Sequence, residues 1–335
     1  MMEILITGVG WRLPDIEPVE GESDRCISTL VYRAVKDCLT DAQISMPEVD
    51  AVVTASVDLW DGKTASNIAV TEAVGAVMKS ETRIAGDGLL ALMHAAMMIA
   101  SGHYQRVLVV AHGKASEADQ QALSNWSFDP VYQQTLQLNE AHALALQSKA
   151  FAARAGVEQV STWVRSMSVC DGPQHTAPQG DGACAVLIEA GRPGAVRLEA
   201  FGYDMEAHYL GDRDLSRSHA LARAAQRAYR IAGVTDAGSQ IDSCYWSLRT
   251  TEQLALWAEA CGVWSLEQGL DALGGKRHRM QWVGLPPFAA GLQRLICAVR
   301  DLRAASEPKR ALVQGCHGPA GQLQAACLLT NFAGA

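Results

Sequence analysis

Short apolar segments rich in valine, isoleucine and leucine alternate along the chain with longer segments of helical periodicity. Apolar runs of this kind, bounded by polar turns, are typical of strands buried on both faces. Their alternation with helices predicts an α/β fold built on a mainly parallel sheet. The pattern places strands at residues 3–9, 50–57, 106–111, 183–189, 196–201, 243–248, 310–315 and 326–331.

The order of these elements repeats at the scale of half the chain. A helix that opens at Gly88 leads to the strand at 106–111, and a helix that opens at Gly291 leads to the strand at 310–315. A similar helix–strand unit precedes this pair in each half, and an apolar strand closes each half. Because three units recur in the same order, the pattern indicates a duplicated architecture.

The two predicted halves, residues 1–190 and 191–335, differ by an insertion in the first. The extra length lies at residues 112–175, where helical segments such as 139–155 interrupt the repeat. Long insertions after the carboxyl end of a strand often form the cover of an active site. We therefore expect the insertion to border the site.

Composition favours a large core and a small or protein ligand. Hydrophobic residues make up 49% of the 335 residues and charged residues 19%, which excludes a disordered chain. The formal net charge is -8, with 28 basic and 36 acidic residues and no basic run. This balance argues against nucleic acid or an anionic membrane as the main partner.

The most apolar segment, residues 89–100, is interrupted by His94 and is shorter than the roughly 20 residues that span a bilayer. It is predicted to be a buried helix. The first residues lead directly into a strand pattern without a signal-peptide pattern, so a cytoplasmic location is expected. The nine cysteines include no Cys-x-x-Cys pair, which favours reduced thiols over a disulfide framework or a zinc site.

Several short motifs, taken in order, resemble the thiolase and ketoacyl synthase superfamily over essentially the whole chain. Asp58-Leu59-Trp60-Asp61-Gly62 and the helical insert at 143–156 are most similar to sterol-carrier-protein-x type thiolases. The resemblance implies a duplicated five-layer α-β-α-β-α fold. The other matching segments are residues 6–10, 42–50, 99–102, 107–110, 114–116 and 180–183.

In this family a nucleophilic cysteine begins the buried helix, where the helix dipole and free amides stabilise a thiolate. The matching turn here, residues 84–88, places Ala85 at the cysteine in a thiolase alignment and Gly86 there in a ketoacyl synthase alignment. Neither residue can form a thioester. Asp87 is the only reactive side chain in the turn, and it is either a catalytic carboxylate or, more commonly for such a residue, a helix cap.

Two family histidines are also replaced. The His-Asp-Cys-Phe motif aligns with residues 245–248, so Tyr245 stands in place of the histidine. A tyrosine can donate a proton or bind an oxyanion, although an aromatic residue at a strand end is more often part of the core. The Gly-His-Pro motif aligns with residues 284–286, and its histidine is Leu285, which can do neither.

One reactive motif is retained. Cys316-His317-Gly318 resembles the family's Cys-x-Gly motif, whose cysteine shuttles a proton in degradative thiolases. His317 is either a replacement base or an inert loop histidine. Asn139-Glu140-Ala141 is similar to the thiolase Asn-Glu-Ala-Phe motif, but it falls in the first-half insertion, and we expect the similarity to be coincidental.

Two functions follow from the resemblance. The first, favoured by the three replaced residues, is a non-catalytic subunit that completes the site of a catalytic thiolase or ketosynthase paralogue as a homo- or heterodimer. A small zinc-ribbon/OB-fold protein or an acyl carrier protein is a further expected partner. The second is a cysteine-independent acyl-CoA enzyme, a retro-aldol lyase or acyltransferase, with a coenzyme A thioester as substrate and no resident cofactor or metal. Its candidate acid–base residues are Tyr245, Asp87, Cys316 and His317.

Overall fold

The computed structural model describes residues 3–15, 26–62, 68–156, 180–191, 196–273, 278–280 and 286–331. Within these residues, ten strands form one hydrogen-bonded sheet in the order β3-β2-β4-β5-β1-β6-β10-β9-β7-β8. The two halves meet at β1 and β6, whose described residues pair at Leu5↔Arg197 and Ile6↔Val196. This short seam joins two five-stranded units.

Both units have the same strand order. If the strands of each unit are numbered one to five in chain order, both units have the order 3-2-4-5-1 from the outer edge of the sheet to the seam. The first strands of the two units therefore lie side by side at the seam. The first unit contains β1 (Ile4–Arg12), β2 (Ala51–Ala55), β3 (Ser80–Ile84), β4 (Arg106–Lys114) and β5 (Asp181–Ala190). The second contains β6 (Val196–Met205), β7 (Ser243–Trp246), β8 (His278–Met280), β9 (Arg310–His317) and β10 (Leu323–Thr330).

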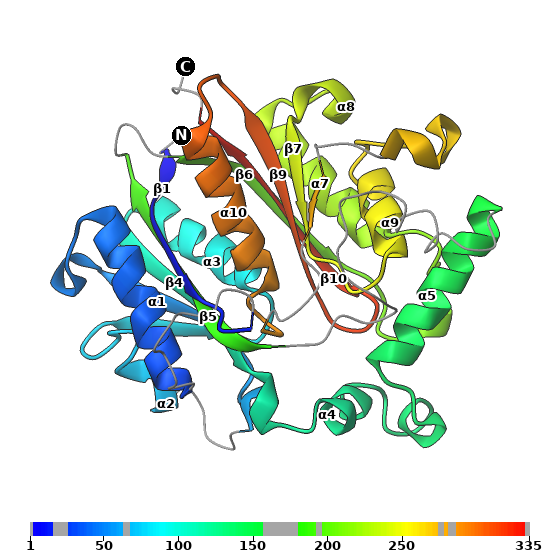
Figure 1. Ribbon diagram of the computed structural model, residues 1–335, viewed down its shortest axis with the longest axis horizontal. Helices are drawn as coiled ribbons and strands as arrows, with labels where there is room; N and C mark the ends of the chain where they lie inside the picture. The colour runs from blue at the N-terminus through cyan, green and yellow to red at the C-terminus, as the bar shows by residue number, and fades with distance from the viewer. Residues whose placement is uncertain are drawn as a thin grey trace.

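The helices complete five layers. The central helices α3 (Gly88–Ala100) and α10 (Ala290–Ala304) pack against each other between the two sheet units, as Figure 1 shows. The outer layers are α1 (Ile27–Ala42) and α2 (Ile68–Thr71) on the first unit, and α7 (His219–Ala232) and α9 (Glu252–Ala260) on the second.

Burial follows from this layering. In β4, Val109 faces the central helices and Leu108 faces the outer layer; in β9, Val313 and Leu312 do the same. Successive strand residues point to opposite faces, so a strand covered on both sides must be apolar throughout. The continuous apolar runs of the sequence are the direct result, and the expected duplicated five-layer fold is confirmed.

All eight predicted strands are present, and two strands were missed. The edge strand β3 has the polar sequence Ser-Glu-Thr-Arg-Ile and is only partly buried, and β8 has three residues. Edge strands need less apolar surface than central ones, so neither gives a clear sequence pattern.

The expectation of a mainly parallel sheet was wrong. Among the described residues, five of the nine strand pairings are antiparallel, because the strands in the middle of the sheet pair antiparallel and only the outer strands pair parallel.

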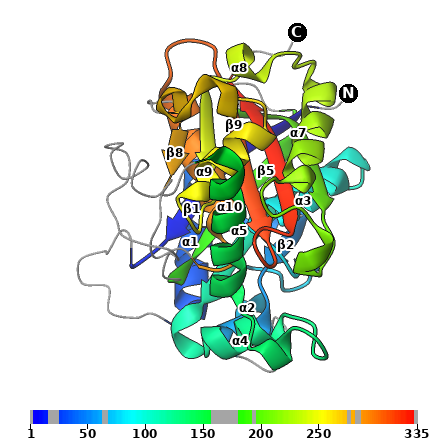
Figure 2. The same ribbon diagram turned by 90° about the vertical axis from the view of Figure 1, so that its right-hand side faces the viewer.

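The insertion extends the molecule beside the second half. It contains α4 (Gln120–Trp126) and α5 (Glu140–Ala155), and α5 packs along α9 (Figure 2). Asn139 caps α5 by accepting a hydrogen bond from the His142 amide, which is where the predicted helical segment begins. Across the described part of the chain, no helix is long and apolar enough to cross a membrane.

Candidate functional site

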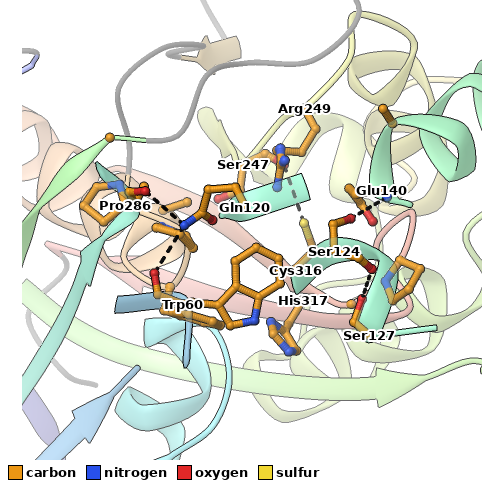
Figure 3. A pocket seen from close by; sticks show the side chains of 18 of the residues that line it. Trp60, Gln120, Ser124, Ser127, Glu140, Ser247, Arg249, Pro286, Cys316 and His317 are labelled. Carbon is orange, nitrogen blue, oxygen red and sulfur yellow. Dashed lines mark hydrogen bonds between the residues drawn. The ribbon is translucent and has the colours of Figure 1, made fainter. Parts of the chain in front are cut away.

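A cavity of about 730 Å³ lies where the carboxyl end of β9 meets the insertion (Figure 3). The end of β9 contributes Cys316 and His317, and the segment after β7 contributes Arg249. The insertion contributes Gln120 from α4 and Glu140 from α5. Residues far apart in the sequence therefore converge on one volume large enough for a small organic ligand.

Cys316 is a protonated thiol in this setting. Its Sγ lies 3.9 Å from the carbonyl oxygen of Ser247. Burial, reinforced by the nearby Asp87 carboxylate, raises the pKa of Cys316 to about 12. Because a thiolate is the nucleophilic form, this environment suits a proton donor and not a nucleophile.

His317 lies against an aromatic wall. Its ring is 5.5 Å from the Phe288 ring, which in turn meets Trp60 edge-to-face at 6.3 Å. Burial lowers the pKa of His317, so the ring is neutral at pH 7 and offers one N–H donor and one acceptor. The rings of His317, Phe288 and Trp60 form an aromatic part of the cavity lining.

Glu140 is the titratable residue that the sequence analysis set aside. Both carboxylate oxygens accept from the Ala320 amide, at 3.3 and 3.2 Å, and its own amide donates to Ser124 Oγ at 2.7 Å. Burial raises the pKa of Glu140 to about 7, against the opposing charge of Arg249. A carboxyl group with this pKa can accept and return a proton at neutral pH.

Glu140 was not proposed as a site residue from the sequence because of its position in the first-half insertion. The Asn-Glu-Ala signal was visible but was expected to be coincidental because it falls in the first-half insertion. The insertion crosses to the second half, where α5 packs on α9 and its first turn meets the end of β9. The similarity to the Asn-Glu-Ala-Phe motif does not explain why Glu140 lies here. We therefore infer its role from its position in the cavity lining and not from the motif.

Buried glutamines fix the strand ends around the cavity. Gln314 Nε2 donates to Gln324 Oε1 at 2.8 Å, and Gln314 Oε1 accepts from the Ser247 amide at 2.9 Å. Gln253 Nε2 donates to Gln147 Oε1 at 2.9 Å. All four glutamine side chains are buried. Their hydrogen bonds join β9 to β10 and to the segment after β7, and join α5 to α9, without using a formal charge.

Asp87 caps two helices at once. Its Oδ1 accepts from the Leu89 amide of α3 and its Oδ2 from the Gly291 amide of α10, both at 2.9 Å. A Cβ added at Gly291 or Gly315 would lie 2.0 or 2.4 Å from Asp87 Oδ1, so glycine is required at both positions. Burial raises the pKa of Asp87 to about 7, while the two amides lower it.

The turn that precedes α3 does not line the cavity. Asp87 and Gly86 are buried outside the cavity lining, and Ala85 is exposed to solvent. Asp87 nevertheless influences the site, because its charge acts on Cys316. Leu285 lies outside the described residues.

Tyr245 points away from the cavity. It is 1% exposed, and its hydroxyl donates to Asp301 Oδ2 at 2.6 Å. Asp301 lies near the carboxyl end of α10, whereas Phe288 and Ala290 border the cavity at the opposite end of that helix. Of the four residues proposed from the sequence, Cys316 and His317 thus lie together in the cavity, and Asp87 and Tyr245 lie outside its lining.

A charged cluster lies on the first-half side of the cavity, at the end of β4. Lys114 Nζ donates to Asp181 Oδ2 at 2.5 Å, and Ser116 Oγ donates to the same oxygen at 2.7 Å. His112 Nδ1 lies 3.3 Å from Asp61 Oδ2. Across the described residues, no three His, Cys, Asp or Glu side chains form a group suited to a metal ion.

Comparison with known proteins places the fold. No protein-family model and no curated protein matches the chain. Among solved structures, an Ltp2-ChsH2(DUF35) aldolase matches with a TM-score of 0.70 and 15% identity, over 98% of this chain and 97% of that one. Human mitochondrial 3-ketoacyl-CoA thiolase in complex with CoA matches with a TM-score of 0.66 and 14% identity, over 99% and 98%.

A third match is the monomeric SCP2-thiolase like protein type 1 of Mycobacterium smegmatis, with a TM-score of 0.62 and 16% identity, over 99% of this chain and 78% of that one. Each of the three matches covers 98% or 99% of this chain. The chain therefore has a thiolase-like fold.

Proposed function

We propose that the protein is a carbon–carbon lyase that cleaves a β-hydroxyacyl thioester by acid–base catalysis, without a covalent acyl-enzyme. One observation carries the proposal: Glu140 and Cys316 border the same cavity, with pKa values of about 7 and about 12. A base that titrates at neutral pH and a thiol that stays protonated are the two groups that a retro-aldol reaction requires. The likeness to an aldolase and to a CoA-bound thiolase supports a thioester substrate.

In the proposed reaction, the Glu140 carboxylate removes the proton from the β-hydroxyl group. The Cα–Cβ bond breaks, the β-carbon becomes a carbonyl group, and the bonding electrons form a thioester enolate. The neutral His317 ring donates a hydrogen bond to the enolate oxygen, which stabilises the developing charge. The Cys316 thiol protonates the α-carbon, and Glu140 returns its proton to the thiolate. The products are a ketone or aldehyde and a shortened acyl thioester.

The test is cleavage of β-hydroxyacyl-CoA thioesters by the purified chain, with both products followed by mass spectrometry. Glu140→Gln should lower kcat by about 100-fold or more, because the amide cannot accept the hydroxyl proton. Glu72→Gln removes the same charge from an exposed residue outside the cavity lining and should leave kcat unchanged. Unchanged turnover in Glu140→Gln, or an acylated protein in the intact mass spectrum, contradicts the mechanism.

A second function, the non-catalytic subunit, is favoured by the residues before α3. Ala85, where the resemblance expects the nucleophile, is exposed and inert, and the partly buried β3 forms an edge of the sheet. Such an edge can pair with a homologous thiolase or ketosynthase subunit. The likeness to an Ltp2-ChsH2(DUF35) aldolase supports a heteromeric assembly, for which a small zinc-ribbon/OB-fold protein is the proposed second partner and an acyl carrier protein the alternative.

Copurification with a cysteine-bearing paralogue distinguishes the two functions. The subunit function predicts turnover only in the mixture of the two chains. A stable homodimer of this chain that cleaves the thioester with no paralogue present excludes the subunit function. Parallel assays with CoA-bound and carrier-bound acyl groups identify which thioester is used.

A further inference from the structure

The turn between β9 and β10 has an unfavourable backbone conformation. Ala320 has a φ of 48°, in the left-handed region that residues with a Cβ rarely adopt, between Gly318 at 79° and Gly321 at 67°. A left-handed alanine is sterically unfavourable and persists only where its surroundings hold it. Ala320 is 2% exposed, so its surroundings are protein.

Helix α5 holds Ala320 by both of its backbone polar groups. The Ala320 amide donates to the Glu140 carboxylate, and the Ala320 carbonyl oxygen accepts from Gln147 Nε2 at 3.0 Å. Glu140 and Gln147 are about two turns apart, so they project from the same face of the helix. One face of α5 therefore holds Ala320 by hydrogen bonds to both its amide and its carbonyl oxygen.

Gln147 is itself fixed from the other side. Its Oε1 accepts from Gln253 Nε2 at 2.9 Å, and Gln253 Oε1 accepts from the Arg249 amide at 2.7 Å. Gln147 is 3% exposed and Gln253 is fully buried. Gln147 thus lies at the junction of α5, the β9–β10 turn and the segment after β7, all of which border the cavity.

We propose that Gln147 is a positioning residue: by holding Ala320 to α5, it keeps the Glu140 carboxyl group against the turn that follows Cys316 and His317. The effect of Gln147 on the Glu140 carboxyl group is independent of the proposed function. Its effect on turnover rests on that function. Without Gln147, α5 loses one of its two attachments to the turn, and water reaches the Glu140 carboxylate. Gln147 touches neither substrate nor reacting atoms in this scheme.

The experiment measures the titration of Glu140 directly, in protein labelled with ¹³C at the glutamate δ-carboxyl, with Glu140→Gln used to assign the resonance. The wild-type midpoint is expected near 7. Gln147→Met should lower it by about one pH unit or more, because hydration favours the ionised form. Gln293→Met removes another buried glutamine, on α10, and should leave the midpoint unchanged.

If Gln147→Met does not fold, Gln253→Met removes the second bond to the same side chain and should give a smaller shift in the same direction. A midpoint unchanged in Gln147→Met, or an equal shift in Gln293→Met, overturns the proposal. In turnover, the acid limb of the kcat–pH profile should move with the midpoint while KM changes less. The expected midpoint shift without any thioester cleavage would instead overturn the proposed function and leave the positioning role intact.

Discussion

The two halves of the molecule end their fourth strands in opposite ways. β4 begins at Arg106 and β9 at Arg310, and counted from these arginines His112 and Cys316 occupy equivalent positions. The equivalence follows from the repeated strand order. The ends of β4 and β9 therefore have equivalent backbone positions but chemically different side chains.

The first-half end is closed by charges that pair with one another. Lys114 is bonded to Asp181, and His112 faces Asp61, with all four side chains buried. The hydrogen bonds from Lys114 and Ser116 outweigh the effect of burial and lower the pKa of Asp181. Such a cluster directs its charged side chains at one another and holds the strand end in place.

The second-half end is held by neutral amides instead. Gln314 and Gln324 satisfy each other and the neighbouring backbone, and no formal charge is used. The reactive side chains Cys316 and His317 are then left facing the cavity, together with Glu140. The comparison teaches that the duplicated fold uses one strand end mainly for stability and keeps the other for chemistry.

The largest effect is expected from breaking the charged end. Lys114→Met leaves the Asp181 carboxylate buried without its ion pair, and should lower the free energy of unfolding by about 3–5 kcal/mol. Urea unfolding at pH 7 measures it. The double variant Lys114→Met/Asp181→Leu removes both charges and should recover much of the loss. A loss below about 1 kcal/mol in the single variant would show that the cluster is not a buried ion pair in solution.

The neutral end should be less sensitive. Gln314→Leu leaves the Ser247 backbone amide and the side-chain oxygen Oε1 of Gln324 without their partner, at a cost of about 1–3 kcal/mol. The same urea titration compares it directly with Lys114→Met. A loss larger than that of Lys114→Met would reverse the comparison between the two strand ends.

The difference between the two ends marks the limit of what the sequence predicted. The eight strands were readable because doubly buried strands impose continuous apolar runs. The five layers, and the choice of Cys316 and His317 as candidates, were implied by the resemblance to the thiolase and ketoacyl synthase superfamily. Glu140 was not readable, because its role depends on α5 crossing from one half to the other, and no local pattern encodes that packing. The direction of Tyr245 was unreadable for a similar reason, since either face of a buried strand accepts an aromatic residue.

The two ends should also respond to pH with opposite sign. The folded-state pKa of Asp181 is lowered, so its stabilisation is present above the ordinary value of 3.8 and is lost as the pH falls through the folded value. The pKa of Glu140 is raised from 4.5 to about 7, so the folded protein binds the extra proton and loses stability as the pH rises across that window.

Glu140→Gln should therefore gain stability relative to the wild type between pH 4.5 and 7, by about 1–2 kcal/mol after allowance for partial exposure of the carboxyl group. Thermal unfolding of both proteins at closely spaced pH values measures this difference. Glu72→Gln, on the surface, should show no such trend. A constant difference between Glu140→Gln and the wild type over the whole range would mean that Glu140 is hydrated and ordinary.

The smallest effect concerns Tyr245, whose equivalent in the first half is Val53. Both residues pair with corresponding residues of the fourth strand, Val313 and Val109, and both face the central helices. Tyr245→Phe keeps the buried ring and removes only the hydrogen bond to Asp301, a half-exposed carboxylate. We expect a loss of stability of about 0.5–1 kcal/mol and an unchanged kcat. A fall in kcat of about tenfold or more, with stability unaffected, would place the phenol at the reacting atoms and break the equivalence with Val53.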